Sequence, residues 1–313
     1  MPKQVSLVVG AAAILAAAFA WWAFPRAGRD TGATRDTSPS AAPAQGSSTP
    51  APNAGRRAVA AASRSVSQSL DPRPFIEVRA ELERLAEAGD AHAALRLGRT
   101  LAQCNGYVPM TDAQLEDFVV DVSAVGMSLV TSEGRQQTPE ALLETLKLGF
   151  AQKRLDCRDT GALHDADART KALRWIERSA ALGNADAQAL YGSTAFSSYD
   201  ARDALVDAEN LREHKRRAID YLQKSLAQGD ALALLELHRS YSTGTLYPAD
   251  AAAAYAHLYA YSLTPRASEL APELLERTLA SHAKALDAQG LQRARDEGRR
   301  LAACCGGAAG EAP

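Results

Sequence analysis

The chain has 313 residues, of which 46% are hydrophobic and only 6% aromatic, so its apolar content is mostly alanine and leucine, which favour helices over strands. Residues 1–70 carry seven of the 35 basic residues and two of the 37 acidic ones, so residues 71–313 carry 28 basic and 35 acidic residues. A folded part with a net charge of −7 presents no basic surface to a phosphate backbone, which argues against nucleic-acid binding.

The N-terminal segment predicts contact with a membrane. Twenty consecutive residues, 5–24, carry no charge, and as a helix they would extend about 30 Å, the thickness of the hydrocarbon core. We expect residues 1–25 to form an uncleaved transmembrane anchor, with Trp21 and Trp22 at the interface. The alternative is a signal peptide cleaved after Ala20, in the small-x-small pattern of Ala18 to Ala20.

The orientation of this segment follows from two opposing signals. Arg26, Arg29 and Arg35 follow it, and only Lys3 precedes it, which by positive-inside counting favours a cytoplasmic domain. The short basic start and the cysteine placement described below favour export. We therefore expect a single-pass inner-membrane protein with a periplasmic domain, or a periplasmic protein if the segment is cleaved.

Residues 26–70 are rich in alanine, serine, threonine, proline and glycine. They hold too few large apolar residues to offset the entropy of ordering them, which predicts a disordered tether. Its root-mean-square reach is on the order of 40 Å.

The pattern glycine, Asp or Asn, alanine occurs three times, at residues 89–91, 183–185 and 229–231. Glycine can adopt the left-handed conformation that ends one helix, and the following Asp or Asn can cap the next. So short a turn makes the two helices antiparallel neighbours, and such pairs must stack to bury their apolar faces. The positions that define the pattern are Gly89, Asp90, Ala93, Gly98, Gly183, Asn184, Ala187, Gly192, Gly229, Asp230 and Ala233.

At these positions the sequence resembles the Sel1-like repeat family, which consists of TPR-related α/α repeats. The match is best in the middle copy, with Ala172, Trp175, Ala180, Gly183, Ala187 and Gly192, while the third keeps Ala218, Tyr221, Gly229, Ala233 and Leu237. Glu81 replaces the aromatic residue in the first copy, and His238 replaces the last glycine of the third. The resemblance covers residues 78–262 except about 105–170, and Asp250 is expected to cap the first helix of a further repeat.

The resemblance implies an all-α fold, an α/α superhelical solenoid over residues 71–303. Within the interruption, Asp112 is expected to open a helix that runs to about Leu129, and Pro139 to open another. These two helices could form a degenerate repeat with longer loops. Two helices after Pro272 are expected to cap the solenoid, and residues 304–313 to form a disordered tail.

The four cysteines fall into two pairs. Cys104 and Cys157 bracket the interruption, and a disulfide between them would close a loop of about 50 residues, worth about 3–4 kcal/mol. Two unrelated buried thiols are the alternative. Cys304 and Cys305 are adjacent, a spacing that seldom forms a mutual bridge, so free thiols and an intermolecular link both stay open.

No motif for a metal, a cofactor or a catalytic group occurs, so we expect none of these and no enzymatic activity. Trp175 and Tyr221 are expected to pack between helices, and His238 to be a tolerated polar residue in a diverging repeat. First helices tend to line the concave face of an α-solenoid, which suggests either a solvated charged face or a groove for an acidic peptide. The basic residues on those helices are Lys171, Arg174, Arg178, Arg217 and Lys224.

The sequence therefore predicts a membrane-tethered repeat protein of the bacterial envelope that binds an unidentified protein or peptide. The alternative is a small-ligand-binding or enzymatic site in the irregular region, residues 105–170.

Overall fold

The computed structural model describes residues 67–124, 138–197 and 207–306. The predicted membrane segment, most of the predicted tether and residues 307–313 lie outside this part of the chain. All regular elements within it are helices. None of these described helices is long and apolar enough to cross a membrane.

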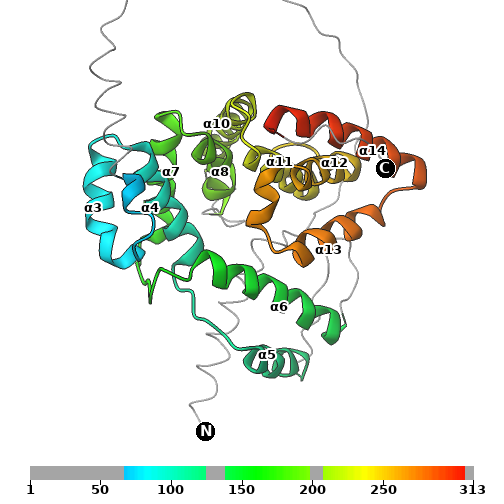
Figure 1. Cartoon of the computed structure of the whole chain (residues 1–313), viewed down its shortest axis with the longest axis horizontal. Coiled ribbons are helices and arrows are strands. Elements are labelled where there is room, and N and C mark those ends of the chain that lie inside the picture. Colours follow the sequence, from blue (N-terminus) through cyan, green and yellow to red (C-terminus); the bar gives the residue numbers. More distant parts are fainter. Residues whose placement is uncertain (1–66, 125–137, 198–206, 307–313) are drawn as a thin grey trace, which may run out of the picture.

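The repeats expected from the sequence are present as helix pairs that follow one another along an arc (Figure 1). Three pairs surround the three glycine turns, and the chain continues through a fourth region that ends with the C-terminal helix. The pairs are α3 (Phe75–Glu87) with α4 (Ala91–Cys104), α7 (Ala168–Ala181) with α8 (Ala185–Phe196), and α10 (Ala208–Ala227) with α11 (Leu232–Thr243). The remaining elements of the arc are α12 (Ala251–Ser262), η1 (Pro265–Glu269), α13 (Pro272–Ala283) and α14 (Ala288–Ala302).

The turn chemistry predicted from the sequence is confirmed at all three glycines, and the predicted side-chain cap is confirmed at the first two turns. Gly89, Gly183 and Gly229 all have positive φ, at 97°, 88° and 79°, the region that only glycine enters without strain. Asp90 accepts a hydrogen bond from the backbone N–H of Ala93, and Asn184 does the same for Ala187. Asp250 caps α12 as expected, accepting from the N–H groups of Ala252 and Ala253. The third turn differs, because Asp230 accepts from the N–H of Leu232 and α11 begins after Ala231 without a side-chain cap.

The alanine and glycine positions of the repeat are points of close helix contact. A Cβ at Gly98 would lie 2.7 Å from Cγ1 of Ile176 and 2.9 Å from its backbone nitrogen, so α4 and α7 touch there directly. Gly192 makes a similar contact with α10, because a Cβ added at Gly192 would lie 3.2 Å from the Cβ of Ala218. Successive pairs are thus joined through the last helix of one pair and the first helix of the next.

The interruption is looped out of this stack. Because α4 packs on α7, the pairs on either side of residues 105–167 are direct neighbours. The two helices of the interruption are therefore not inserted between the first and second pairs of the stack. Its two ends meet where the backbone N–H of Gly106 donates to the carbonyl of Leu163 at 2.8 Å and the sulfurs of Cys104 and Cys157 are bonded.

The looped-out segment consists of two helices, α5 (Asp112–Ala124) and α6 (Pro139–Asp156). They share a small apolar core of their own, made of Leu115, Val119, Leu142 and Leu146. Helix α6 starts at Pro139, as predicted, with Thr138 as its cap. Residues 125–137, where the predicted continuation of α5 falls, lie outside the described part of the chain.

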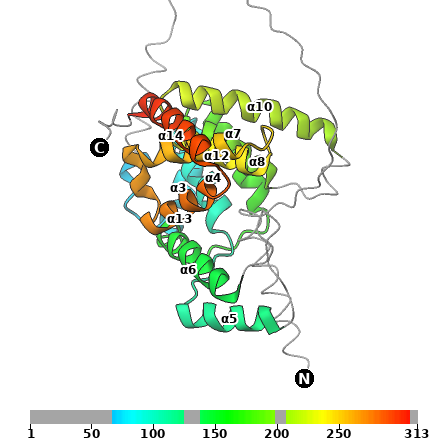
Figure 2. The same cartoon turned by 90° about the vertical axis from the view of Figure 1, so that its right-hand side faces the viewer.

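Helix α6 spans the open side of the arc, from α4 to α13 (Figures 1 and 2). At its C-terminal end the disulfide of Cys157 ties it to α4. Near the same end, the side chain of Gln152 donates to the carbonyl of Glu269 and accepts from the N–H of Ala271. We call α6 the crossbar, and the arc of repeats and the crossbar together form a ring of helices.

The folded body begins before residue 71, inside the predicted tether. Ser67 is fully buried, and its hydroxyl donates at 3.0 Å to the same carboxylate oxygen of Asp90 that caps α4. The carbonyl of Leu70 accepts from the guanidinium of Arg96. Serine and glutamine in residues 67–70 resemble the tether in composition, so only these contacts identify them as part of the fold.

Two glycine-to-alanine substitutions should have opposite effects on stability. Gly98→Ala introduces a methyl group against Ile176 and should lower the free energy of unfolding by about 1–3 kcal/mol. Gly149→Ala meets no atom within 4 Å and lies inside α6, so it should raise that free energy by about 0.5–1 kcal/mol. Urea unfolding of both variants tests this, and equal effects would contradict the close contact of α4 with α7.

Reduction of the Cys104–Cys157 bond should loosen the crossbar. The bond closes a stretch of 53 residues, so its loss should cost about 3–4 kcal/mol. Hydrogen exchange with and without a dithiol reductant should show faster exchange in α6 than in α8 or α11. The Cys304→Ala/Cys305→Ala variant should respond in the same way, whereas Cys104→Ala/Cys157→Ala should be insensitive to the reductant.

Candidate binding cleft between α6 and α13

The inner side of the ring carries a charged network centred on Arg266. Its guanidinium bonds to Asp186 of α8 at 2.7 Å, to Asp230 of the turn before α11 at 2.6 Å and to Glu269 at 2.8 Å. Asp230 also accepts from the hydroxyl of Ser225 and from the N–H of Leu232. One arginine thus connects three elements that are far apart in the sequence.

The charge of Arg266 shifts the pKa values of its carboxylate partners. Burial raises the pKa of Asp186, but the hydrogen bonds and charge of Arg266 outweigh that effect and leave it below its ordinary value. Burial and the nearby charge of Asp186 raise the pKa of Asp230. A guanidinium shared by three carboxylates has little capacity left for a ligand, so we assign this network a structural role.

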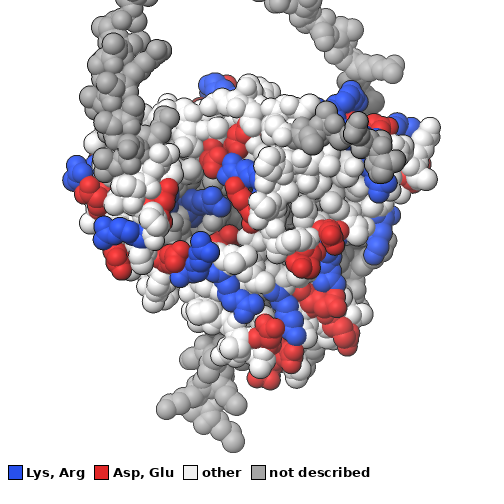
Figure 3. Space-filling view, viewed as in Figure 1, with Lys and Arg blue, Asp and Glu red and all other residues white. Residues whose placement is uncertain are grey.

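The space-filling view shows a hollow in the face of the ring, with both acidic and basic side chains around it (Figure 3). The charges of Arg99 and His92, both on α4, contribute to lowering the pKa of Asp186. These two residues therefore lie near the Arg266 network. Side chains of both signs thus surround the hollow (Figure 3).

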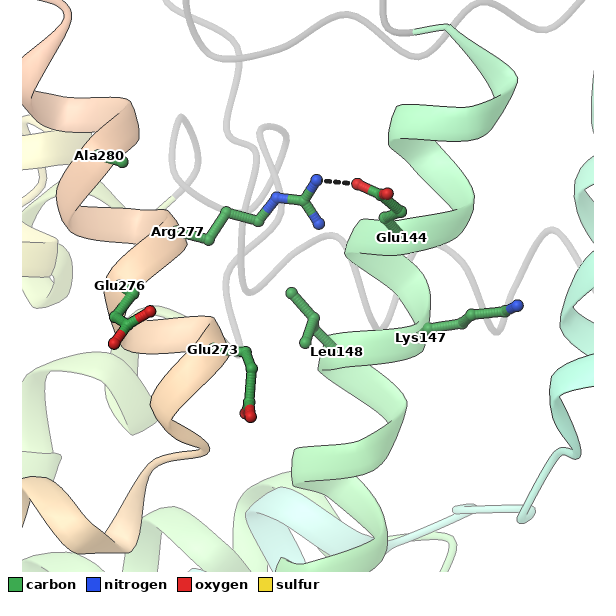
Figure 4. A pocket seen from close by; sticks show the side chains of 7 residues that line it. All are labelled: Glu144, Lys147, Leu148, Glu273, Glu276, Arg277 and Ala280. Atoms are coloured by element: carbon green, nitrogen blue, oxygen red, sulfur yellow. Dashed lines mark hydrogen bonds and ion pairs between the residues drawn. The ribbon is translucent and has the colours of Figure 1, made fainter.

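An open surface depression lies between α6 and α13. It is a shallow cleft of 580 Å³ whose two walls come from residues 139–156 and 272–283 (Figure 4). The α6 wall contributes Glu144, Lys147 and Leu148, and the α13 wall contributes Glu273, Glu276, Arg277 and Ala280. One wall of this cleft is thus built by the segment that departs from the repeat pattern.

The charges of the cleft are only partly neutralised. Arg277 reaches across from α13 to pair with Glu144 (Figure 4), and Lys147 donates to Glu116 of α5 at 2.7 Å. Both basic side chains of the cleft are therefore committed. The carboxylates of Glu273 and Glu276 make no ion pair with any residue in the described part of the chain. Leu148 on α6 and Ala280, one turn beyond Glu276 on α13, add apolar surface to the lining.

The positions of the two walls follow from local sequence and from the crossbar contacts. Each helix has a proline in its first turn, Pro139 in α6 and Pro272 in α13, where proline fits without losing a hydrogen bond. The Gln152 amide then holds α6 to the chain just before α13, through Glu269 and Ala271. The cleft is the gap that remains between the two helices beyond that point.

The basic residues that the sequence singled out do not lie in this cleft. They are on α7 and α10, and α10 lies on the opposite side of the ring from α6 (Figure 2). Each has a partner: Lys171 pairs with Asp165, Arg174 lies over Trp175, Arg178 donates to the Glu87 carbonyl, Arg217 pairs with Glu177 and Glu213, and Lys224 pairs with Asp220. Their role in binding an acidic peptide stays a prediction.

Trp175 and Tyr221 pack between helices, as the sequence predicts, and so does His238. Trp175 is buried, and Tyr221 packs partly buried against the central core, edge-on to Tyr191. His238 is buried at the helix contact usually given to glycine, where its Nδ1 lies 3.0 Å from the Ala254 carbonyl of α12. Burial lowers the pKa of His238 to about 3, so it is neutral in the fold.

The second cysteine pair is not bridged. Cys304 is exposed and Cys305 is buried against the C-terminal core. Burial and the neighbouring Cys304 raise the pKa of Cys305 to about 12, which leaves its thiol protonated and unreactive at neutral pH. Within the described residues no group of His, Cys, Asp and Glu side chains has the arrangement of a metal site.

The sequence pointed to the region that forms the cleft but not to its residues. Leu148, Glu273 and Glu276 belong to two helices whose composition is ordinary for partly exposed helices. No local pattern distinguishes them, because the cleft arises only where two helices more than 100 residues apart come together.

Comparisons with known proteins leave the family of the chain open. No family profile matches it, and no curated protein matches it. Among solved structures it is similar to the crystal structure of c5321, a protective antigen present in uropathogenic Escherichia coli strains displaying an SLR (Sel1-like repeat) fold. The identity is 15% and the TM-score 0.27, over 80% of this chain and 62% of that one. A likeness of this size assigns neither family nor function.

Loss of the central arginine should destabilise the protein more than loss of the arginine in the cleft. Arg266→Ala leaves the carboxylates of Asp186 and Asp230 facing each other without a counter-charge, and should cost roughly 3 kcal/mol. Arg277→Ala removes an exposed pair and should cost less than about 1 kcal/mol. Chemical unfolding of the two variants decides this, and equal losses would mean that the Arg266 network does not hold the ring together.

Proposed function

We propose that this protein is a helical-repeat interaction module, and that the cleft between α6 and α13 is where it binds a partner protein. The observation that carries the proposal is the cleft itself. The arc is held together by saturated contacts such as the Arg266 network, whereas the cleft combines apolar surface with two carboxylates that lack a partner in the described chain. A binding surface needs groups that the fold leaves available.

The position of the cleft supports the same proposal. Loops and insertions carried on a rigid scaffold are common places for binding sites. Here the C-terminal part of the insertion is held to α4 by the bond between Cys104 and Cys157, and to the chain before α13 by the hydrogen bonds of Gln152. One wall is thus specific to this chain, while the repeats provide the rigid support.

We further propose that the module works in the bacterial envelope, tethered to the inner membrane with its repeat domain in the periplasm. Two observations support this: the twenty uncharged residues near the N-terminus, and the close pairing of Cys104 with Cys157, since disulfides persist in oxidising compartments. If the N-terminal segment is cleaved, the same domain would be released into the periplasm.

Site-specific photocrosslinking in cells tests the binding role. A photoreactive amino acid at Ala280, which is exposed in the cleft, should yield one discrete adduct with another protein. The same amino acid at Arg212, exposed on α10 at the far side of the ring, should not.

The cleft would lose its proposed role if the two positions gave the same adducts or neither gave one. Turnover of a substrate by the purified protein, abolished by changes at Glu144 or Glu273, would instead favour the enzymatic alternative for this region.

A further inference from the structure

We propose that the partner presents a basic segment to the cleft, with two basic side chains that pair with Glu273 and Glu276 and an apolar side chain that rests on Leu148. This inference rests on the proposed function, and it specifies the chemistry of the partner.

The charge of the cleft supports this partner. Its cations, Lys147 and Arg277, are already paired with Glu116 and Glu144, so they offer little to an anionic ligand. Glu273 and Glu276 retain their negative charge without a described counter-ion. The excess is therefore negative in the cleft, as it is over residues 71–313 as a whole, which would steer a basic partner towards the domain.

The spacing of the two carboxylates suits a peptide segment. Glu273 and Glu276 are three residues apart on α13, so their Cβ atoms are neighbours at about 5–6 Å. Basic residues three or four apart on a helix have the same spacing, and alternate residues of an extended strand are about 6.6 Å apart. Either form can place two cations opposite the two carboxylates.

The size and surface of the cleft also favour a segment over a folded domain. Its 580 Å³ accommodate a few side chains, within the range of sites for small ligands and peptide anchors. Leu148 and Ala280 are the apolar residues of the lining, and Figure 4 shows Leu148 pointing from α6 towards α13. A segment that alternates basic and apolar side chains would cover both kinds of surface.

A defined probe tests the inference with the full chain in nonionic detergent. The probe is a fluorescein-labelled peptide of eight residues in which lysine and leucine alternate, and its binding is followed by fluorescence anisotropy. We expect saturable binding that weakens with added salt. The same peptide with glutamate in place of lysine should not bind.

Matched variants locate the binding. Glu273→Gln/Glu276→Gln should weaken it at least tenfold, and so should Ala280→Arg, which places a cation in the cleft. Glu87→Gln/Glu209→Gln removes the same charge at exposed positions on α3 and α10, and should change the affinity less than twofold. All of these residues are exposed, and unfolding curves will verify that each variant is folded.

Several results would overturn the inference. Unchanged affinity in the Glu273→Gln/Glu276→Gln variant would do so, as would an equal loss in the control variant. If Arg56→Gln/Arg57→Gln/Arg64→Gln in the tether raised the affinity tenfold, the occupant would be the chain's own basic segment and no partner. A photocrosslinked adduct at Ala280 that persists in Glu273→Gln/Glu276→Gln would leave the binding role intact and refute only the basic partner.

Discussion

The direct contact of α4 with α7 at Gly98 is the constraint on which the rest of the architecture depends. Without a side chain at this position the two helices approach until Ile176 fills the space, and the second repeat then stacks on the first as if nothing lay between them. The segment between must leave the stack and return to it at one place. Two contacts join the ends of the segment there: the disulfide between Cys104 and Cys157, and the backbone hydrogen bond from Gly106 to Leu163.

The exclusion of this segment has a consequence for shape. A regular solenoid is an open arc whose inner side is accessible along its length. In this protein α6 crosses the open side and meets the chain again before α13, so the arc becomes a ring (Figure 1). The Arg266 network reinforces the arc from within, because a single guanidinium joins α8, the start of α11 and η1.

Charged residues that are paired within the chain differ in role from those that are not. Arg266 shares its donors among three carboxylates, and the five basic residues on α7 and α10 all have partners within the chain. Arg178 and Arg217 connect different helices, whereas Arg174 and Lys224 interact within their own helix. Glu273 and Glu276 differ from these groups, because neither makes an ion pair within the described part of the chain, while Arg277 and Gln152 link the elements on the two sides of the cleft.

Local physical chemistry determined what the sequence alone could predict. A glycine followed by Asp or Asn ends one helix and begins the next wherever it stands, so the turns at Gly89, Gly183 and Gly229 were predictable residue by residue, as was the start of α6 at Pro139. The pairing of Cys104 with Cys157 followed from their positions at the two ends of one interruption.

The tertiary structure decided what depends on contacts between distant residues. Only the packing of α4 on α7 showed that residues 105–167 leave the stack, and only the crossing of α6 to α13 brought Leu148 opposite Glu273. Ser67 belongs to the folded body because its hydroxyl bonds to Asp90. The composition around Ser67 is the same as in the tether, so the sequence alone does not indicate this. Turns and caps are set by neighbouring residues, whereas the cleft is set by where two separate helices come to lie.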